Sequence, residues 1–193
     1  MKLVIINYGA GNIKSIQFAF KRLGVDAILS SDAEEIKAAD KVIFPGVGEA
    51  SSAMKMLKES KLDRIIPQLK KPVLGICLGM QLMCNQTDEG NTKGLEIFDV
   101  NVKRFSNKVK VPQMGWNTIT NLESNLFEGI SDKDYMYLVH SFYAEENENS
   151  IATTDYEISY ASALHKDNFY GVQFHPEKSG KSGEKILKNF LNL

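Results

Sequence analysis

The sequence predicts an α/β fold, a doubly wound, mostly parallel central sheet with helices on both faces and additional antiparallel strands in the C-terminal half. Two observations predict it. Up to about residue 94, short apolar runs alternate with segments of helical periodicity, which is the pattern of a parallel sheet covered on both faces. Beyond residue 94, short strand-like segments follow one another without long helices between them, as in antiparallel sheet.

Each element of the first half follows from its local pattern. Residues 3–6 form a continuous apolar run, as expected for a strand that is buried on both faces. Residues 13–23 carry apolar side chains at helical spacing, and Gly24 ends this predicted helix. By the same criteria we expect further strands at residues 27–29, at 42–44 and from residue 73, and further helices at 32–39, 50–57, 62–69 and 80–84.

The second half is predicted to consist mainly of strands, and a helix at residues 182–191 closes it. The strands are expected at residues 100–105, 116–120, 135–139, 151–154, 160–164 and 169–174. Residues 88–93 and 145–150 are expected to be exposed loops. No linker rich in glycine, proline and serine divides the chain, so we expect one domain spanning residues 1–193, the alternative being two separately folded halves.

Composition limits the partners and the compartment. With 43% hydrophobic and 24% charged residues, the chain resembles an ordinary soluble globular protein. The formal net charge of −1 provides no global field that would attract nucleic acid or an anionic membrane, so we expect neither as a partner. The chain enters its first strand without a secretory signal, and no apolar run approaches membrane-spanning length. We therefore expect a cytoplasmic protein with reduced thiols.

Cys77 is the first candidate for catalysis. It lies at the centre of the run GICLG, residues 75–79, between a predicted strand and a predicted helix, which is the pattern of a strand–turn–helix elbow. The flanking glycines leave room for the sharp turn, and the start of the helix stabilises a thiolate. The N–H group of Leu78 has no acceptor within the helix and can face an oxyanion. The alternative is a buried structural cysteine, which is the role we expect for Cys84 on the same helix.

The second candidate is the run PGVG, residues 45–48, at the end of the third predicted strand. Open α/β sheets bind ligands beyond the carboxyl ends of their strands. The two glycines around Val47 allow the backbone to approach a ligand and the Gly46–Val47 peptide to turn over. One N–H group from this run, together with that of Leu78, would make a two-donor oxyanion hole. An ordinary strand-to-helix turn is the alternative.

The third candidate is the pair His175 and Glu177. Proline at position 176 favours an extended conformation at His175, and alternate residues of an extended chain point the same way. A carboxylate beside an imidazole fixes its tautomer and stabilises the imidazolium, so His175 suits a base for Cys77. The alternative is a surface turn, which is the more common role of such a segment when it is considered in isolation. His140 is a second candidate base, ranked lower because no carboxylate lies at a matching spacing.

Cofactor and metal motifs are incomplete. Gly9 and Gly11 follow the first predicted strand as in a dinucleotide-binding loop, but position 14, where a third glycine is required, holds Lys14. No Walker phosphate loop is present, and three histidines and two cysteines offer no cluster with metal-ligand spacing. We expect no cofactor and no metal.

These three motifs, in this order and over the whole chain, resemble those of the class I glutamine amidotransferases. The resemblance implies the fold of that family, a Cys77–His175–Glu177 triad, L-glutamine as substrate, and an oxyanion hole at Val47 and Leu78. It also implies a set of residues that hold glutamine. By similarity these are Gly48, Gln81, Glu89, Ser141 and Phe142, of which Glu89 is placed only by its distance from Cys77.

Within that family, four segments are similar to the glutaminase subunits of imidazole glycerol phosphate synthase. They are residues 7–12, 112–117, 140–142 and 175–179. The resemblance implies that ammonia released from glutamine passes to a separate (β/α)8-barrel cyclase subunit, which makes imidazole glycerol phosphate and AICAR in histidine biosynthesis. It places Asn12, Trp116, Tyr137 and Lys178 at the interface with the cyclase. For the aromatic residues, core packing is the alternative.

Three other functions remain open at this point. The chain could be the glutaminase subunit of another amidotransferase, for anthranilate, aminodeoxychorismate or guanylate synthesis. It could be a free-standing γ-glutamyl hydrolase, which would turn over without a partner. It could also be a non-catalytic binding module, which the presence of Cys77, His175 and Glu177 argues against.

Overall fold

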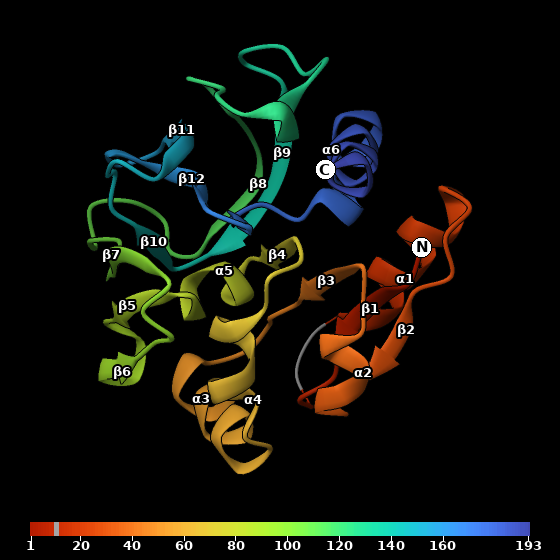
Figure 1. Ribbon diagram of the computed structural model, residues 1–193. Coiled ribbons are helices and arrows are strands. Elements are labelled where there is room, and N and C mark those ends of the chain that lie inside the picture. Colours follow the sequence, from red (N-terminus) through yellow and green to blue (C-terminus); the bar gives the residue numbers. More distant parts are fainter. Residues whose placement is uncertain (10–11) are drawn as a thin grey trace.

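The computed structural model describes residues 1–9 and 12–193 (Figure 1). Ala10 and Gly11, which belong to the predicted loop after the first strand and to one of the matching segments, lie outside the described residues. Among the described residues, eleven strands form one mixed sheet, and two more strands form a separate antiparallel ribbon. Both features of the predicted fold class, the mostly parallel first half and the antiparallel second half, are confirmed.

The first half of the chain alternates strands and helices as predicted. The elements are β1 (Leu3–Ile6), α1 (Ile13–Arg22), β2 (Ile28–Ser30), α2 (Ala33–Lys37), β3 (Lys41–Phe44), α3 (Ala50–Glu59), α4 (Leu62–Ile65), β4 (Val73–Ile76) and α5 (Leu78–Leu82). A short 3-10 turn, Ile66–Gln68, extends α4, so the single predicted helix at residues 62–69 is divided in two. The strands pair in parallel in the order β2-β1-β3-β4.

The second half supplies most of the antiparallel strands. They are β5 (Cys84–Thr87), β6 (Thr92–Lys93), β7 (Phe98–Arg104), β8 (Gln113–Thr118), β9 (Tyr135–His140), β10 (Phe142–Ala144), β11 (Ser150–Asp155), β12 (Ser159–Lys166) and β13 (Phe169–Val172), followed by α6 (Gly180–Asn192). The hairpin β12–β13 returns the chain to the centre of the sheet, where β13 pairs in parallel with β4 and antiparallel with β12. The main sheet then continues through β10, β7, β5 and β6, while β8 and β9 form the ribbon.

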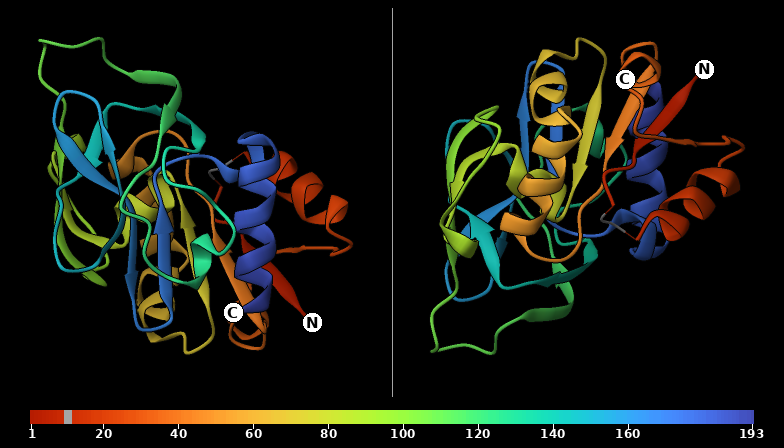
Figure 2. Two further views of the ribbon diagram at one scale, coloured as in Figure 1. Left: turned by 90° about the horizontal axis from the view of Figure 1, so that it is seen from above. Right: turned by 90° about the horizontal axis from the view of Figure 1, so that it is seen from below.

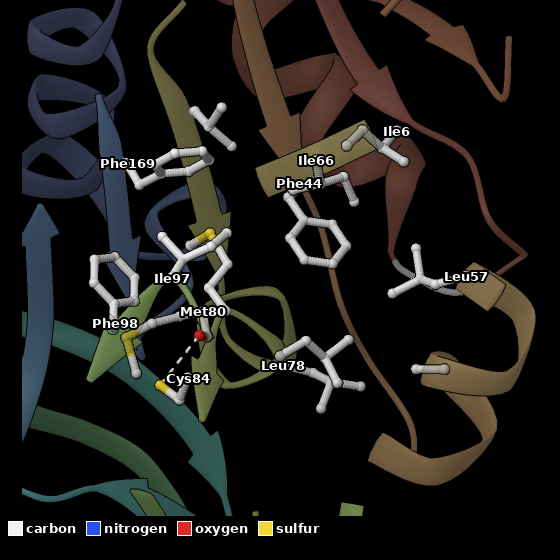
Figure 3. Close-up of a cluster of buried hydrophobic side chains, with 14 of the residues drawn as sticks. Ile6, Phe44, Leu57, Ile66, Leu78, Met80, Cys84, Ile97, Phe98 and Phe169 are labelled. Atoms are coloured by element: carbon white, nitrogen blue, oxygen red, sulfur yellow. Dashed lines mark hydrogen bonds between the residues drawn. The ribbon is translucent and has the colours of Figure 1, made fainter. Parts of the chain in front are cut away.

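Helices cover both faces of the parallel strands, and alternate strand residues point to each side. Val4 and Ile6 of β1 pack into the cluster that includes buried residues of α2, α3 and α4 (Figure 3). Leu3 and Ile5 pack into the opposite cluster with buried residues of α1 and α6. Figure 2 shows α1 and α6 together on one side of the sheet. This burial on both faces explains why the predicted strands are apolar without alternation.

Some local predictions are wrong. Cys84 does not continue the helix after Cys77 but begins β5, and its thiol donates to the carbonyl oxygen of Met80 within the apolar cluster (Figure 3). Its predicted role in core packing is nevertheless confirmed, since Cys84 is fully buried. Residues 88–93 are not simply an exposed loop, because Thr92 and Lys93 pair with β5 and Thr92 is buried. Both short strands form by pairing with residues elsewhere in the sequence, so the local residue pattern did not indicate them.

No helix in residues 1–9 or 12–193 combines the length and apolarity needed to cross a membrane.

Candidate active site

The backbone bends sharply at Cys77, between β4 and α5. Cys77 has a φ of 53° and a ψ of −113°, a conformation that is costly for a residue with a side chain. Its N–H group donates to the carbonyl oxygen of Val172 at 2.8 Å, which ties the bend to β13. A Cβ atom at Gly79 would collide with the carbonyl oxygen of Phe44, and one at Gly75 with the side chain of Met83. The flanking glycines therefore provide the predicted space for the elbow.

The PGVG loop packs directly against this elbow. It follows β3, and the Tyr8 hydroxyl donates to the carbonyl oxygen of Pro45 at 2.8 Å. A Cβ atom at Gly46 would collide with the backbone nitrogen of Gly79, so the loop and the start of α5 are in contact. Gly48 has a φ of 95°, in the region that favours glycine. The loop is thus fixed at Pro45, next to the Gly46–Val47 peptide.

His175 and Glu177 come together as predicted, although the backbone differs from the one expected. The Nδ1 atom of His175 lies 2.9 Å from Oε1 of Glu177, and both side chains are almost completely buried. His175 is extended, but residues Pro176–Lys178 form a 3-10 turn rather than extended chain. The backbone of His175 is held from two sides, since its N–H donates to the Tyr137 carbonyl and its own carbonyl accepts from the Ser179 hydroxyl.

The environment of His175 favours the imidazolium. Burial by itself would lower the pKa of His175, but hydrogen bonds to Cys77 and Glu177 and the negative charges of both groups act against burial and raise the pKa to about 10. The proton is therefore retained on the ring at neutral pH.

Apart from Glu177, the predicted catalytic, oxyanion and glutamine-binding residues line one pocket of about 290 Å³ at the carboxyl ends of β3 and β4. Its lining includes the predicted nucleophile and base, both predicted oxyanion positions and every predicted glutamine-binding residue. These are Val47, Gly48, Cys77, Leu78, Gln81, Glu89, Ser141, Phe142 and His175, joined by Pro112, Val139 and His140. Glu177 lies behind His175. The volume suits a ligand of amino-acid size.

Two groups beside the sulfur were not predicted. The Nε2 atom of Gln173 lies 3.6 Å from Sγ of Cys77, and the thiol lies 3.9 Å from the carbonyl oxygen of Val139. Gln173 is completely buried. The contact of Gln173 with Cys77 could have been predicted from its position two residues before His175 in a segment expected to be extended. Residues two apart in an extended chain point to the same side, so Gln173 is expected on the side of His175.

Two of the predicted glutamine-binding residues also have structural contacts. The Nε2 atom of Gln81 donates to the Phe142 carbonyl at 2.9 Å and to Oε1 of Gln173 at 2.8 Å. The carboxylate of Glu89 accepts from the N–H of Ala50 at 2.9 Å and so helps to cap α3. Partial burial, and to a smaller extent the charge of Glu49, raise the pKa of Glu89.

His140, the alternative base, is engaged elsewhere. Its Nδ1 atom lies 2.7 Å from the Phe142 carbonyl and its Nε2 atom 3.2 Å from the Tyr160 hydroxyl. Burial lowers the pKa of His140 to about 4, so the ring is neutral at pH 7 and Nδ1 carries the proton that Phe142 accepts. Both ring nitrogens therefore have partners, which favours His175 as the base.

The four predicted interface residues are partly or largely exposed. Trp116 is 55% exposed, and its ring packs edge-on against that of Tyr137 in the ribbon β8–β9. The Nζ atom of Lys178 lies 5.8 Å from the centroid of the Tyr137 ring. Met114 and Tyr135 in the same ribbon are each 61% exposed. Asn12 lies at the start of α1 and accepts a hydrogen bond from Ser15. An exposed apolar surface of this kind is typical of an interaction site.

The part of the chain that the structure describes contains no group of three or more histidine, cysteine, aspartate and glutamate side chains that could hold a metal ion.

Comparisons with known proteins identify relatives over the full chain. The model of the family "Glutamine amidotransferase class-I" matches residues 4–193. The chain is 58% identical over 196 residues to "Imidazole glycerol phosphate synthase subunit HisH" of Bacteroides fragilis, with all of both chains covered. It is 45% identical to the HisH subunit of Haemophilus influenzae, covering 99% of this chain and 97% of the relative.

Solved structures show the same fold at low sequence identity. A putative GMP synthase subunit from Thermoplasma acidophilum matches with a TM-score of 0.77 at 20% identity, covering 100% of this chain and 92% of that chain. The structure of PurLQS from Thermotoga maritima matches with a TM-score of 0.77 at 15% identity, covering 99% and 97%. The family model and the close relatives together show that the chain belongs to the class I glutamine amidotransferase family.

Proposed function

We propose that the chain hydrolyses L-glutamine to glutamate and ammonia and supplies the ammonia to a separate cyclase subunit of imidazole glycerol phosphate synthase. The observation that carries this proposal is the pocket where the Cys77 elbow and the buried His175–Glu177 pair meet. Membership of the amidotransferase family supports the chemistry, and full-length similarity to HisH subunits supports the pathway, histidine biosynthesis. We place the enzyme in the cytoplasm, where a thiol nucleophile stays reduced.

The first chemical step is attack by sulfur on the side-chain carboxamide of glutamine. The proton of the Cys77 thiol is already held by His175 when glutamine binds, and the resulting thiolate adds to the carboxamide carbon. The oxyanion is held by the N–H of Leu78 and one N–H of the Val47 loop. Leu78 begins α5, so its N–H lacks an acceptor within the helix.

The second step releases ammonia. His175 returns its proton to the nitrogen as the carbon–nitrogen bond breaks, which leaves a γ-glutamyl thioester on Cys77. Water then attacks the thioester carbonyl with His175 as base, and glutamate departs as the thiol is restored. Glu177 holds the ring and stabilises the imidazolium in both steps.

The glutamine side chain is positioned by the pocket walls. Gly48 and the backbone of Ser141 and Phe142 lie around it. Gln81 uses both amide hydrogens on protein acceptors, so its carbonyl oxygen is the atom left to contact the substrate. Glu89 offers a partly buried carboxylate on the rim.

The cyclase partner would bind the surface formed by Trp116, Tyr137, Lys178 and Asn12. Trp116 and the neighbouring Met114 and Tyr135 are exposed on the free chain, which supports an interface over core packing. A partner of the (β/α)8-barrel class is expected, and the ammonia would travel through its barrel.

One reconstitution tests the proposal. The chain is mixed with the cyclase, its nucleotide ligand and glutamine, and glutamate is measured. We expect glutamate release that depends on the partner and disappears in Cys77→Ala, while cyclisation with added ammonium salt continues. Glutamate release without any partner would indicate a free-standing hydrolase instead. Loss of the ammonium-driven reaction in Cys77→Ala would contradict the proposed division of labour.

A further inference from the structure

A directed chain of hydrogen bonds runs from a backbone carbonyl to the Cys77 sulfur. It begins at the carbonyl oxygen of Phe142, which can only accept. The amide nitrogen of Gln81 lies 2.9 Å from this oxygen, and the same nitrogen lies 2.8 Å from Oε1 of Gln173. The Gln173 amide nitrogen then lies 3.6 Å from Sγ of Cys77.

The direction of this chain follows from its starting point. If the Gln81 amide were turned over, its oxygen would face the Phe142 carbonyl oxygen, and the two acceptors would repel each other. The nitrogen of Gln81 must therefore face Phe142, which makes Gln81 a donor to Gln173 as well. The oxygen of Gln173 is fixed by that contact, so its N–H group is the one that faces the sulfur.

We propose that Gln173 is a catalytic residue that donates an N–H hydrogen bond to the Cys77 sulfur and stabilises its thiolate. The inference deepens the proposed glutamine hydrolysis and rests on it for its catalytic meaning. His175 supplies the charge that favours the thiolate, and Gln173 supplies a second, neutral donor to the same atom. A hydrogen bond to an ionised acceptor is stronger than one to a neutral acceptor, so the contact favours the anion over the thiol.

The surroundings of Gln173 keep this donor in place. The residue is fully buried, and its backbone N–H donates to the Ser162 carbonyl at 2.9 Å. Water cannot replace its contacts, and a buried hydrogen bond is electrostatically stronger than an exposed one. Gln81 therefore has two functions, since it orients Gln173 through its nitrogen while its oxygen remains for the substrate.

The sulfur can be probed directly on the free chain. Iodoacetamide reacts with the thiolate, so the alkylation rate of Cys77 as a function of pH reports how readily the thiol ionises. We expect Gln173→Met, which keeps the length of the side chain but has no N–H group, to shift the midpoint of this profile upward by about one pH unit. Gln81→Met should shift it in the same direction by less, because Gln173 then loses its fixed orientation.

Neither variant replaces any of the other titratable residues near the sulfur. They are His175, Glu177, His140, Tyr8, Tyr160 and Glu89. A matched control is Asn189→Leu in α6. It removes another buried side-chain amide, which donates to the carbonyl oxygens of Leu126 and Glu128. It should lower thermal stability without moving the alkylation profile, and Cys77→Ala gives the blank.

The outcomes separate this inference from the proposed function. An unchanged midpoint in Gln173→Met would overturn the role of Gln173, and so would an unchanged midpoint in Gln81→Met if Gln173→Met does not fold. Because alkylation needs neither glutamine nor a partner, it remains informative if the reconstituted wild type releases no glutamate. That last result would contradict the proposed function and leave the hydrogen bond to sulfur in place.

Discussion

The two sides of the pocket are built by different forces. The elbow wall, residues 45–48 and 77–81, is held by close backbone contacts, since neither Gly46 nor Gly79 has room for a Cβ atom. The imidazole wall, residues 139–142 and 173–177, is held by polar bonds that join distant segments. His175, for example, is bonded through its backbone to Tyr137 and Ser179 and through its ring to Glu177.

This difference predicts different responses to mutation. Steric packing tolerates no added atom, so changes in the elbow wall should cost folding stability. Buried polar bonds set the charge of the groups they contact, so changes in the imidazole wall should alter activity and its pH dependence at a smaller cost in folding. Mutations within each wall, and the pH dependence of stability, test this contrast.

The largest effect is expected from Glu177→Gln in the imidazole wall. The amide keeps the shape of the side chain but removes the negative charge beside Nδ1 of His175, and it can hold the ring in the wrong tautomer. We expect glutamate release in the reconstituted enzyme to fall by about 10³-fold in a variant that is still folded at the assay temperature, although the lost charge partner of His175 lowers its melting temperature. A large loss of melting temperature with activity retained would remove the distinction between the walls.

Gly79→Ala tests the elbow wall. The added methyl group would collide with the Phe44 carbonyl oxygen, and we expect a loss of about 3 kcal/mol in the free energy of unfolding by urea titration. Gly24→Ala is the matched control, because Gly24 has a positive φ but no atom near its Cβ position. It should cost only about 1 kcal/mol. Equal losses in both variants would show that steric contact does not define the elbow.

The pH dependence of stability tests the buried histidines of the imidazole wall. In the unfolded chain His140 binds a proton below about pH 6.5, whereas burial lowers its folded pKa to about 4. Its contribution to stability is therefore lost as the pH falls, by about 2 kcal/mol between pH 7 and pH 5. Urea titrations at both values should show this loss in the wild type and a smaller one in His140→Gln. An identical loss in both would contradict a neutral buried His140.

His175 should act in the opposite direction. Its folded pKa is raised to about 10, so the stability that it contributes is present below pH 6.5 and is lost as the pH rises toward 10.

The smallest effect on the free chain is expected from Trp116→Ala, which lies outside both walls. Because the side chain is 55% exposed, unfolding free energy should change by less than about 0.5 kcal/mol. Partner-dependent glutamate release at limiting cyclase should nevertheless fall. Ile28→Ala, at another exposed apolar residue on the edge strand β2, is the control and should leave that release unchanged. A large loss of stability in Trp116→Ala would assign the ring to the core instead.

The same contrast explains how far the sequence predicts the site. The elbow wall was predictable, because glycine spacing and apolar runs express a local steric requirement at Cys77. The parallel character of the first half was predictable, because strands and helices alternate there, but the order of the strands in the sheet was not predicted. The Cys84 strand and the contact of Gln173 with sulfur were not predicted, because their partners lie elsewhere in the chain. A polar contact between two residues that are far apart in the sequence produces no periodic pattern in that sequence.

The most direct test of the central claim is covalent labelling of Cys77 by a diazoketone analogue of glutamine in the complex with the cyclase. We expect mass spectrometry to find one adduct, on Cys77, that excess glutamine prevents and that His175→Asn forms far more slowly. Absence of the adduct, or labelling that glutamine does not slow, would contradict a glutamine site where the elbow thiol and the His175 imidazole meet.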